Sequence, residues 1–169
     1  MGKETAKGEV MTIKRLWFVL SASLLGIVLG GFMRARATTI IGDSHVGGLK
    51  PYLMKHMRVY YKNGSTAGYW LRKKITDGAL VVMTGTNDAL NNVPVKTWMN
   101  QTASICSHSK RCYVVAPPAN KYNKYQPYRR ALSGKKNVIY PSQQQTRDGV
   151  HYFHAGYRYM AREILDAVK

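Results

Sequence analysis

The chain has 169 residues, of which 26 are Lys or Arg and eight are Asp or Glu, so its formal net charge is +18. This length suits one domain with a single hydrophobic core, and no internal repeat or long linker indicates a second domain. There are two cysteines and no second Cys/His pair at a matching spacing, which argues against a structural zinc site.

The N-terminal segment has the pattern of a secretory signal peptide. A short apolar run, residues 16–29, follows Lys14-Arg15, and the small-x-small site Ala35-Arg36-Ala37 comes after it. We expect residues 1–37 to be removed. An uncleaved membrane anchor is the alternative, because residues 16–33 reach the lower length limit for crossing a bilayer. Residues 11–15 are themselves a typical signal-peptide start, and we hypothesise that translation begins at Met11.

The compartment determines which partners are expected. The 132 residues from Thr38 onward keep 20 basic and six acidic side chains, a formal charge of +14. A cytosolic protein with this charge would be expected to bind nucleic acid. We expect the domain to be periplasmic or secreted, or anchored in the inner membrane and facing the periplasm. The expected partners there are acylated, anionic glycans or lipids and no nucleic acid, with membrane contact only through the N-terminal segment.

Strand and helix patterns alternate along the rest of the chain. In chain order we predict a strand at 38–41, a helix at 46–57, a strand at 58–61, a helix at 66–75, a fully buried strand at 79–83, a helix at 95–107, strands at 112–116 and 137–140, and a closing helix at 152–168. This alternation predicts a parallel sheet that is covered by helices on both faces.

Four short motifs follow predicted strands or precede the last helix. They are Gly-Asp-Ser-His at 42–45, Gly64, Gly-Thr-Asn-Asp at 85–88 and Asp-Gly-Val-His at 148–151. The carboxyl ends of parallel strands meet at one edge of a sheet, so these motifs can converge. A serine hydroxyl needs a base to become a nucleophile, and the base needs a group that fixes its tautomer. We therefore take Ser44 as the candidate nucleophile, His151 as the base and Asp148 as the orienting acid.

The order and context of these motifs resemble the SGNH (GDSL-like) hydrolase family from about residue 38 to the C-terminus. The resemblance implies a flavodoxin-like three-layer α/β/α sandwich with a parallel sheet of about five strands, and a serine esterase without cofactor or metal. It also implies that the N–H groups of Ser44 and Gly64 and the side-chain amide of Asn87 form an oxyanion hole. Asp43 and Asp88 are expected to brace their turns.

Further candidates concern the substrate. His45 stands where the family most often has leucine, and we expect it to line the pocket. Basic and aromatic residues alternate over 121–130, and such side chains stack on sugar rings and pair with acids. The substrate-binding candidates in this stretch are Tyr122, Tyr125, Arg129 and Arg130. A solvated loop is the alternative interpretation.

Two predictions remain. Cys106 and Cys112 are candidates for a disulfide in an oxidising compartment, with reduced thiols as the alternative.

The leading functional hypothesis is an exported serine esterase that removes acyl groups, including acetyl, from an envelope or extracellular glycan. A lysophospholipase or thioesterase of the same family and a non-catalytic polyanion-binding module on this fold are the alternatives. Few insertions separate the motifs, so we expect an open cleft.

Overall fold

A five-stranded, all-parallel sheet forms the centre of the domain. The computed structural model describes residues 38–119, 123–142 and 145–169, so the predicted signal peptide lies outside the described residues. The strands have the order β2-β1-β3-β4-β5, which is the flavodoxin-like order. Their bounds are β1 Thr38–Gly42, β2 Arg58–Tyr61, β3 Ala79–Met83, β4 Arg111–Val115 and β5 Val138–Ile139. The predicted parallel sheet of about five strands is confirmed.

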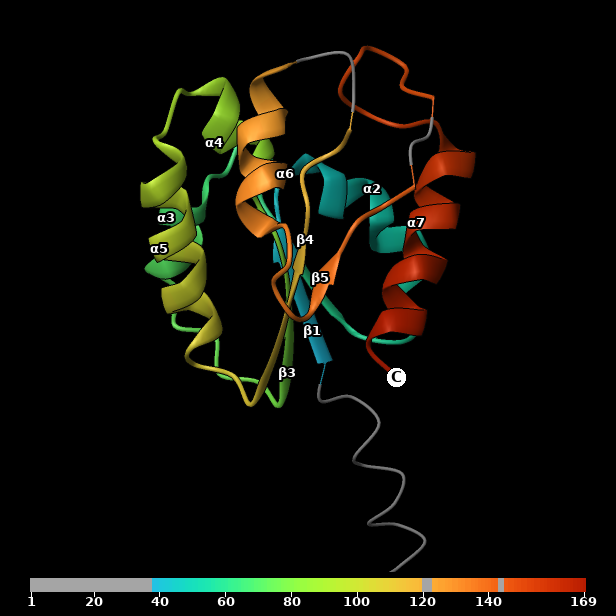
Figure 1. The fold of residues 1–169 in the computed structure, drawn as a ribbon. Coiled ribbons are helices and arrows are strands. Elements are labelled where there is room, and N and C mark those ends of the chain that lie inside the picture. Colours follow the sequence, from blue (N-terminus) through green and yellow to red (C-terminus); the bar gives the residue numbers. More distant parts are fainter. Residues whose placement is uncertain (1–37, 120–122, 143–144) are drawn as a thin grey trace, which may run out of the picture. The chain divides into compact units, whose positions relative to one another are not determined.

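Helices cover both faces of this sheet, which makes three layers (Figure 1). The helices α2, Ser44–Leu53, and α7, His154–Ala167, lie on one face. The other face carries α3 Ala67–Leu71, α4 Thr86–Leu90, α5 Val95–Cys106 and α6 Gln126–Leu132. Every residue of β3 is apolar and buried, as expected for a strand with helices on both sides. No helix in the described ranges is long and apolar enough to cross a membrane.

Each face has its own hydrophobic core. Leu49 and Leu53 of α2 pack with Met160 and Ile164 of α7 against the first face. On the second face, side chains of α3, α5 and α6 pack together around the buried ring of Trp98. The two cores fix α2 and α5 on opposite sides of β1 and β3, which are the strands that carry two of the sequence motifs at their ends.

Several element bounds differ from the sequence prediction. The helix α2 begins at Ser44 rather than at residue 46, because Asp43 caps it, and it ends at Leu53 rather than at 57. The closing helix begins two residues later than predicted, at His154. Two short helices, α4 and α6, were not predicted. The solvated-loop interpretation of residues 121–130 is wrong for residues 123–130, which belong to a short 3₁₀ helix, Asn123–Tyr125, and to α6.

The two cysteines lie on neighbouring elements. Cys106 is the last residue of α5 and Cys112 is the second residue of β4. They are joined by a disulfide, with their Cα atoms 5.3 Å apart. The bond closes the short connection that carries the chain from the helical layer back into the sheet.

Candidate active site

The site begins where β1 ends. Ser44 is the first residue of α2, and Asp43 caps the helix by accepting a hydrogen bond from the backbone N–H of His45 at 2.9 Å. In this sheet order, the ends of β1 and β3 form the topological switch point, where ligands of such folds bind. The short connection from strand to helix thus places the Ser44 hydroxyl at the edge of the sheet where a substrate is expected.

His151 and Asp148 reach Ser44 from a distant part of the chain. The Nε2 atom of His151 lies 2.9 Å from Ser44 Oγ, although the two residues are 107 positions apart. The Nδ1 atom of the same ring lies 2.8 Å from Asp148 Oδ2. The three side chains that the sequence motifs suggested therefore form one continuous hydrogen-bonded chain.

Asp148 is held as a carboxylate by several donors. It accepts hydrogen bonds from the His151 ring and from the backbone N–H groups of His151, at 2.7 Å, and Val150, at 2.9 Å. These bonds, with the ring bond the largest cause, hold the pKa of Asp148 well below its usual range. With Asp148 ionised, Nδ1 of His151 carries the proton and donates it. Nε2 is then left as an acceptor for the Ser44 hydroxyl.

The loop that carries Gly64 is fixed against the end of β1. Both the backbone N–H of Lys62 and the hydroxyl of Ser65 donate to the carbonyl of Gly42, at 3.1 and 3.3 Å. Gly64 has a φ of +72°, and no heavy atom lies within 4 Å of where its Cβ would be. The backbone N–H groups of Ser44 and Gly64 have no hydrogen-bond acceptor among the described residues. Both are therefore available to an oxyanion.

The motif after β3 is tied to the same turn. The amide Nδ2 of Asn87, in α4, donates to Asp43 Oδ2 at 3.2 Å. Asp88 accepts from the backbone N–H groups of Ala67, at 3.1 Å, and Gly85, at 3.0 Å, so it joins the starts of α3 and α4. The prediction that Asp43 and Asp88 brace their turns is confirmed.

Burial changes the acid-base behaviour of two groups beneath the site. Asp43 is 1% exposed, and burial raises its pKa to about 7. His45 is fully buried, and burial lowers its pKa to about 3, so its ring is neutral at physiological pH. Its ring centroid lies 5.5 Å from that of His151, and its Nε2 has no hydrogen-bond partner in the part of the chain that the structure describes.

A cavity of about 340 Å³ opens beside Ser44. Gly47, Gly48 and Pro51 of α2 form one wall. The segment from Arg147 to the start of α7 forms the other, and the Phe153 ring there is 49% exposed. Arg147 and Phe153 were not among the predicted site residues. Their position in the sequence, one residue before and two residues after the Asp-Gly-Val-His motif, was the signal that could have identified them.

The structure corrects two of the substrate-binding candidates. His45 does not line the cavity, because its side chain is buried beneath it. Tyr125 is also fully buried, in the core between the sheet and the second helical layer. Both were expected to contact substrate. Tyr122 lies outside the described residues.

The two arginine candidates lie apart from this cavity. Arg129 donates from Nη1 to the carbonyl of Pro117 at 2.6 Å, and its guanidinium lies 5.3 Å from the Tyr140 ring centroid. Arg130 is exposed on α6. Neither side chain lines the cavity beside Ser44. Among the described residues, no group of three or more His, Cys, Asp or Glu side chains is placed to hold a metal ion.

Comparisons with known proteins identify the fold. No protein-family model and no curated protein matches the chain. A member of the lipolytic protein G-D-S-L family from Veillonella parvula superposes with a TM-score of 0.62 at 15% identity, covering 76% of this chain and 96% of that one. The C-terminal catalytic domain of Streptococcus pneumoniae peptidoglycan O-acetyltransferase A gives 0.58 at 18% identity, over 79% and 93%. TesA gives 0.58 at 15% identity, over 78% and 97%. The resemblance to SGNH hydrolases is thus confirmed at the level of the fold.

Proposed function

We propose that this protein is an exported SGNH-type serine esterase that removes acyl groups, including acetyl, from an anionic envelope or extracellular glycan. The observation that carries the proposal is the hydrogen-bonded chain from Ser44 through His151 to Asp148 at the mouth of a cavity. A non-catalytic binding module has no use for this arrangement, so the geometry favours an enzyme over the polyanion-binding alternative.

The geometry supports a two-step acyl transfer. Nε2 of His151 takes the proton of Ser44 as Oγ attacks the acyl carbonyl, and ionised Asp148 stabilises the imidazolium that forms. The N–H groups of Ser44 and Gly64 and the second amide N–H of Asn87 bind the oxyanion. The alcohol leaves with the proton from His151, and acyl-Ser44 remains. His151 then deprotonates a water molecule, which attacks this ester and releases the acid and the free serine.

The shape of the cavity favours a short acyl group on a bulky alcohol. Its volume of about 340 Å³ is at the small end of ligand sites, and its walls carry the polar side chains of Arg147 and His154. The structural likeness to the catalytic domain of a peptidoglycan O-acetyltransferase supports a glycan ester as substrate. The exposed Phe153 ring favours the second candidate, a lysophospholipase or thioesterase, because it offers apolar surface to a longer chain.

Labelling with a fluorophosphonate probe tests the proposal. These reagents react with a serine only when a base activates it and an oxyanion site stabilises the adduct. The wild-type protein should be labelled at Ser44 and should hydrolyse p-nitrophenyl acetate. Ser44→Ala should lose both properties, whereas Ser104→Ala, on the exposed side of α5, should keep both. Full esterase activity in Ser44→Ala would overturn the assignment. Faster turnover of octanoyl than of acetyl esters would favour the lipid alternative.

Export has its own support and its own test. The signal-peptide pattern of residues 1–37 and the disulfide between Cys106 and Cys112 both suit an oxidising compartment outside the cytoplasm. Intact-mass measurement of the protein from fractionated cells should give a chain that begins at Thr38 in the periplasm or the medium. A full-length precursor retained in membranes would support the anchor instead.

A further inference from the structure

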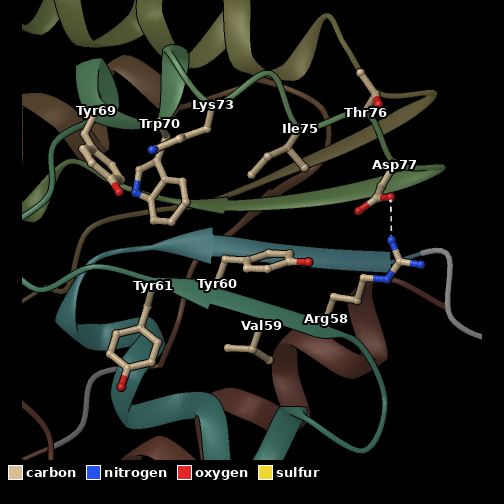
Figure 2. Close-up of a pocket in the computed structure, with 10 residues that line it drawn as sticks. All are labelled: Arg58, Val59, Tyr60, Tyr61, Tyr69, Trp70, Lys73, Ile75, Thr76 and Asp77. Atoms are coloured by element: carbon tan, nitrogen blue, oxygen red, sulfur yellow. Dashed lines mark hydrogen bonds and ion pairs between the residues drawn. The ribbon is translucent and has the colours of Figure 1, made fainter.

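A second and larger cavity lies along the free edge of the sheet. Its volume is about 690 Å³, and it extends between the edge strand β2 and the segment from α3 to residue 77 (Figure 2). We call it the β2-edge groove. The lining residues that matter here are Arg58, Tyr60, Tyr61, Tyr69, Trp70 and Lys73.

Aromatic rings supply much of the surface of this groove. Tyr60 is 50% exposed and Tyr61 is 42% exposed, although both are large side chains. Tyr69 is half-buried, and its ring meets the buried Trp70 ring edge-to-face at 5.1 Å. Trp70 is itself fixed, because its Nε1–H donates to Ser65 Oγ at 3.0 Å. The groove therefore presents flat apolar ring surfaces with polar tips, which suit the faces of sugar rings, and the fixed Trp70 ring supports Tyr69 from beneath.

Cations accompany these rings. The Nζ atoms of Lys62 and Lys73 lie 4.7 and 5.1 Å from the centroid of the Tyr69 ring. Lys50 Nζ lies 5.7 Å from the centroid of the Tyr61 ring. Among the described residues, none of these three ammonium groups pairs with a carboxylate, which leaves them available to an anion.

One acid lines the groove, at the end away from Tyr61. Asp77 accepts hydrogen bonds from Arg58, at 3.3 Å, and from the hydroxyl of Thr39. Figure 2 shows the Arg58–Asp77 pair at the opposite end of the groove from Tyr61 and Tyr69. Arg58 balances the negative charge of Asp77, and the tyrosine-lined end of the groove stays cationic.

The β2-edge groove adjoins the cavity beside Ser44. A Cβ atom on Gly47 would lie 2.9 Å from the Tyr61 ring, so the ring packs directly on that glycine. Gly47 lines the Ser44 cavity, and Tyr61 lines the groove. The backbone of Lys62 is also fixed to Gly42, two residues before Ser44. A chain lying in the groove would therefore pass the Tyr61 ring and reach the reacting serine.

We propose that the β2-edge groove binds an extended saccharide chain that carries carboxylates and presents its acyl group to Ser44. This inference rests on the proposed function for the link to Ser44, but not for the binding itself. The choice of an acidic glycan over a second copy of this chain follows from charge. Two copies would bring the same lysines together, whereas an acidic glycan supplies carboxylates to ammonium groups and sugar faces to tyrosines.

Binding is best measured in the Ser44→Ala protein, where no turnover occurs. The probe is unesterified hexagalacturonate, with neutral maltohexaose as its matched control, and the readout is tryptophan fluorescence at low and high salt. Hexagalacturonate should bind more tightly than maltohexaose and should weaken with salt. Tyr69→Ala and Lys73→Gln should each raise the Kd about five- to tenfold. Tyr69→Phe, which keeps the ring, should bind nearly as well as the parent.

Controls on the opposite edge of the domain make the result specific. Tyr140→Ala and Lys135→Gln remove an exposed ring and an exposed charge away from the groove, and both should leave the Kd unchanged. Equal binding of the two oligosaccharides would overturn the proposal, and so would an equal loss of affinity in the two groove variants, Tyr69→Ala and Lys73→Gln, and the two controls. The proposal would also be overturned if the protein bound no oligosaccharide and instead formed a dimer that the Tyr69 and Lys73 substitutions dissociate. Binding by Ser44→Ala alongside a wild type without esterase activity would refute the proposed function alone.

Discussion

Asn87 donates a hydrogen bond to Asp43 at 3.2 Å and so links the residues that follow two neighbouring strands, β3 and β1. A primary amide has two N–H bonds, and Asp43 occupies one of them. The carboxyl group of Asp43 thereby fixes the plane of the amide next to Ser44. Asp43 thus acts on the proposed chemistry by orienting one of the oxyanion donors, although it touches no reacting atom.

Asn87→Ala should lower the kcat for p-nitrophenyl acetate by ~100-fold or more, because one oxyanion donor is lost. The change in KM should be small, since this donor acts mainly in the transition state. Steady-state kinetics measure both constants. Asn100→Ala, an exposed amide on α5, is the control and should behave as wild type. An effect on KM alone would show that Asn87 only helps to bind substrate.

Asp148→Asn should reduce kcat/KM by up to about 10⁴-fold while leaving the fold intact. The neutral amide no longer selects the His151 tautomer that accepts a proton from Ser44. The Asp148 side chain is exposed enough to be replaced without a packing defect. The amide oxygen of asparagine can still accept the hydrogen bonds from the backbone N–H groups of Val150 and His151. Kinetics across pH 5–9 with a circular dichroism control measure the effect. Unchanged rates would mean that another group orients the imidazole.

Asp43 and His45 should act on stability in opposite directions as pH changes. The folded pKa of Asp43 is raised to about 7, so stability from this group falls as pH rises from about 4 to 7. The folded pKa of His45 is lowered to about 3, so its contribution rises as pH rises from there to about 6.5. In Asp43→Asn, the free energy of unfolding measured in urea should therefore rise more steeply between pH 4 and 6.5 than in wild type. Identical slopes in both proteins would contradict the buried-acid assignment.

Two glycines with positive φ should differ sharply in their tolerance of alanine. Gly85 has a φ of +108°, and a Cβ there would lie 2.7 Å from Pro117. Gly64 has a φ of +72° and open space around it. Gly85→Ala should cost about 2–4 kcal/mol of unfolding free energy, from backbone strain and overpacking together. Gly64→Ala should cost about 1–2 kcal/mol, from strain alone. Chemical denaturation ranks the two, and equal losses would contradict this reasoning.

Replacing both Cys106 and Cys112 by serine should lower stability by about 2 kcal/mol, as expected for closure of so short a loop. Esterase activity at 25 °C should persist, because the disulfide joins α5 to β4 and neither cysteine lines the cavity beside Ser44. Thermal unfolding measures the stability of the oxidised, reduced and double-serine proteins. A loss of activity in the folded double variant would show a longer-range role.

The sequence predicted the sheet well because buried parallel strands are continuous apolar runs, as in β3. It located the ends of β1 and β3 because Gly42 and Gly85 interrupt those runs. Five-residue α4 was missed, since a Gly-Thr-Asn-Asp stretch is typical of a loop. Its start depends on Asp88, which accepts the N–H of Gly85.

The substrate-binding predictions failed where side-chain direction matters. The basic and aromatic residues of 121–130 suggested a sugar-binding surface, but the 3₁₀ helix Asn123–Tyr125 and α6 turn Tyr125, Tyr128 and Leu132 inward. Their spacing of three and four residues was the helical signal in that stretch. No local pattern could predict the β2-edge groove, because Tyr61 and Tyr69 line one cavity only through the packing of α3 beside the edge strand.

The turn that holds Asp148 and His151 has a mechanical consequence. Asp148 accepts both the ring and the backbone N–H of His151, and the N–H of Arg147 donates to the His151 carbonyl at 2.7 Å. Asp148 and His151 are therefore fixed to each other by bonds within one turn. The 2.9 Å contact between His151 Nε2 and Ser44 Oγ then depends on one separation, that between this turn and the first residue of α2.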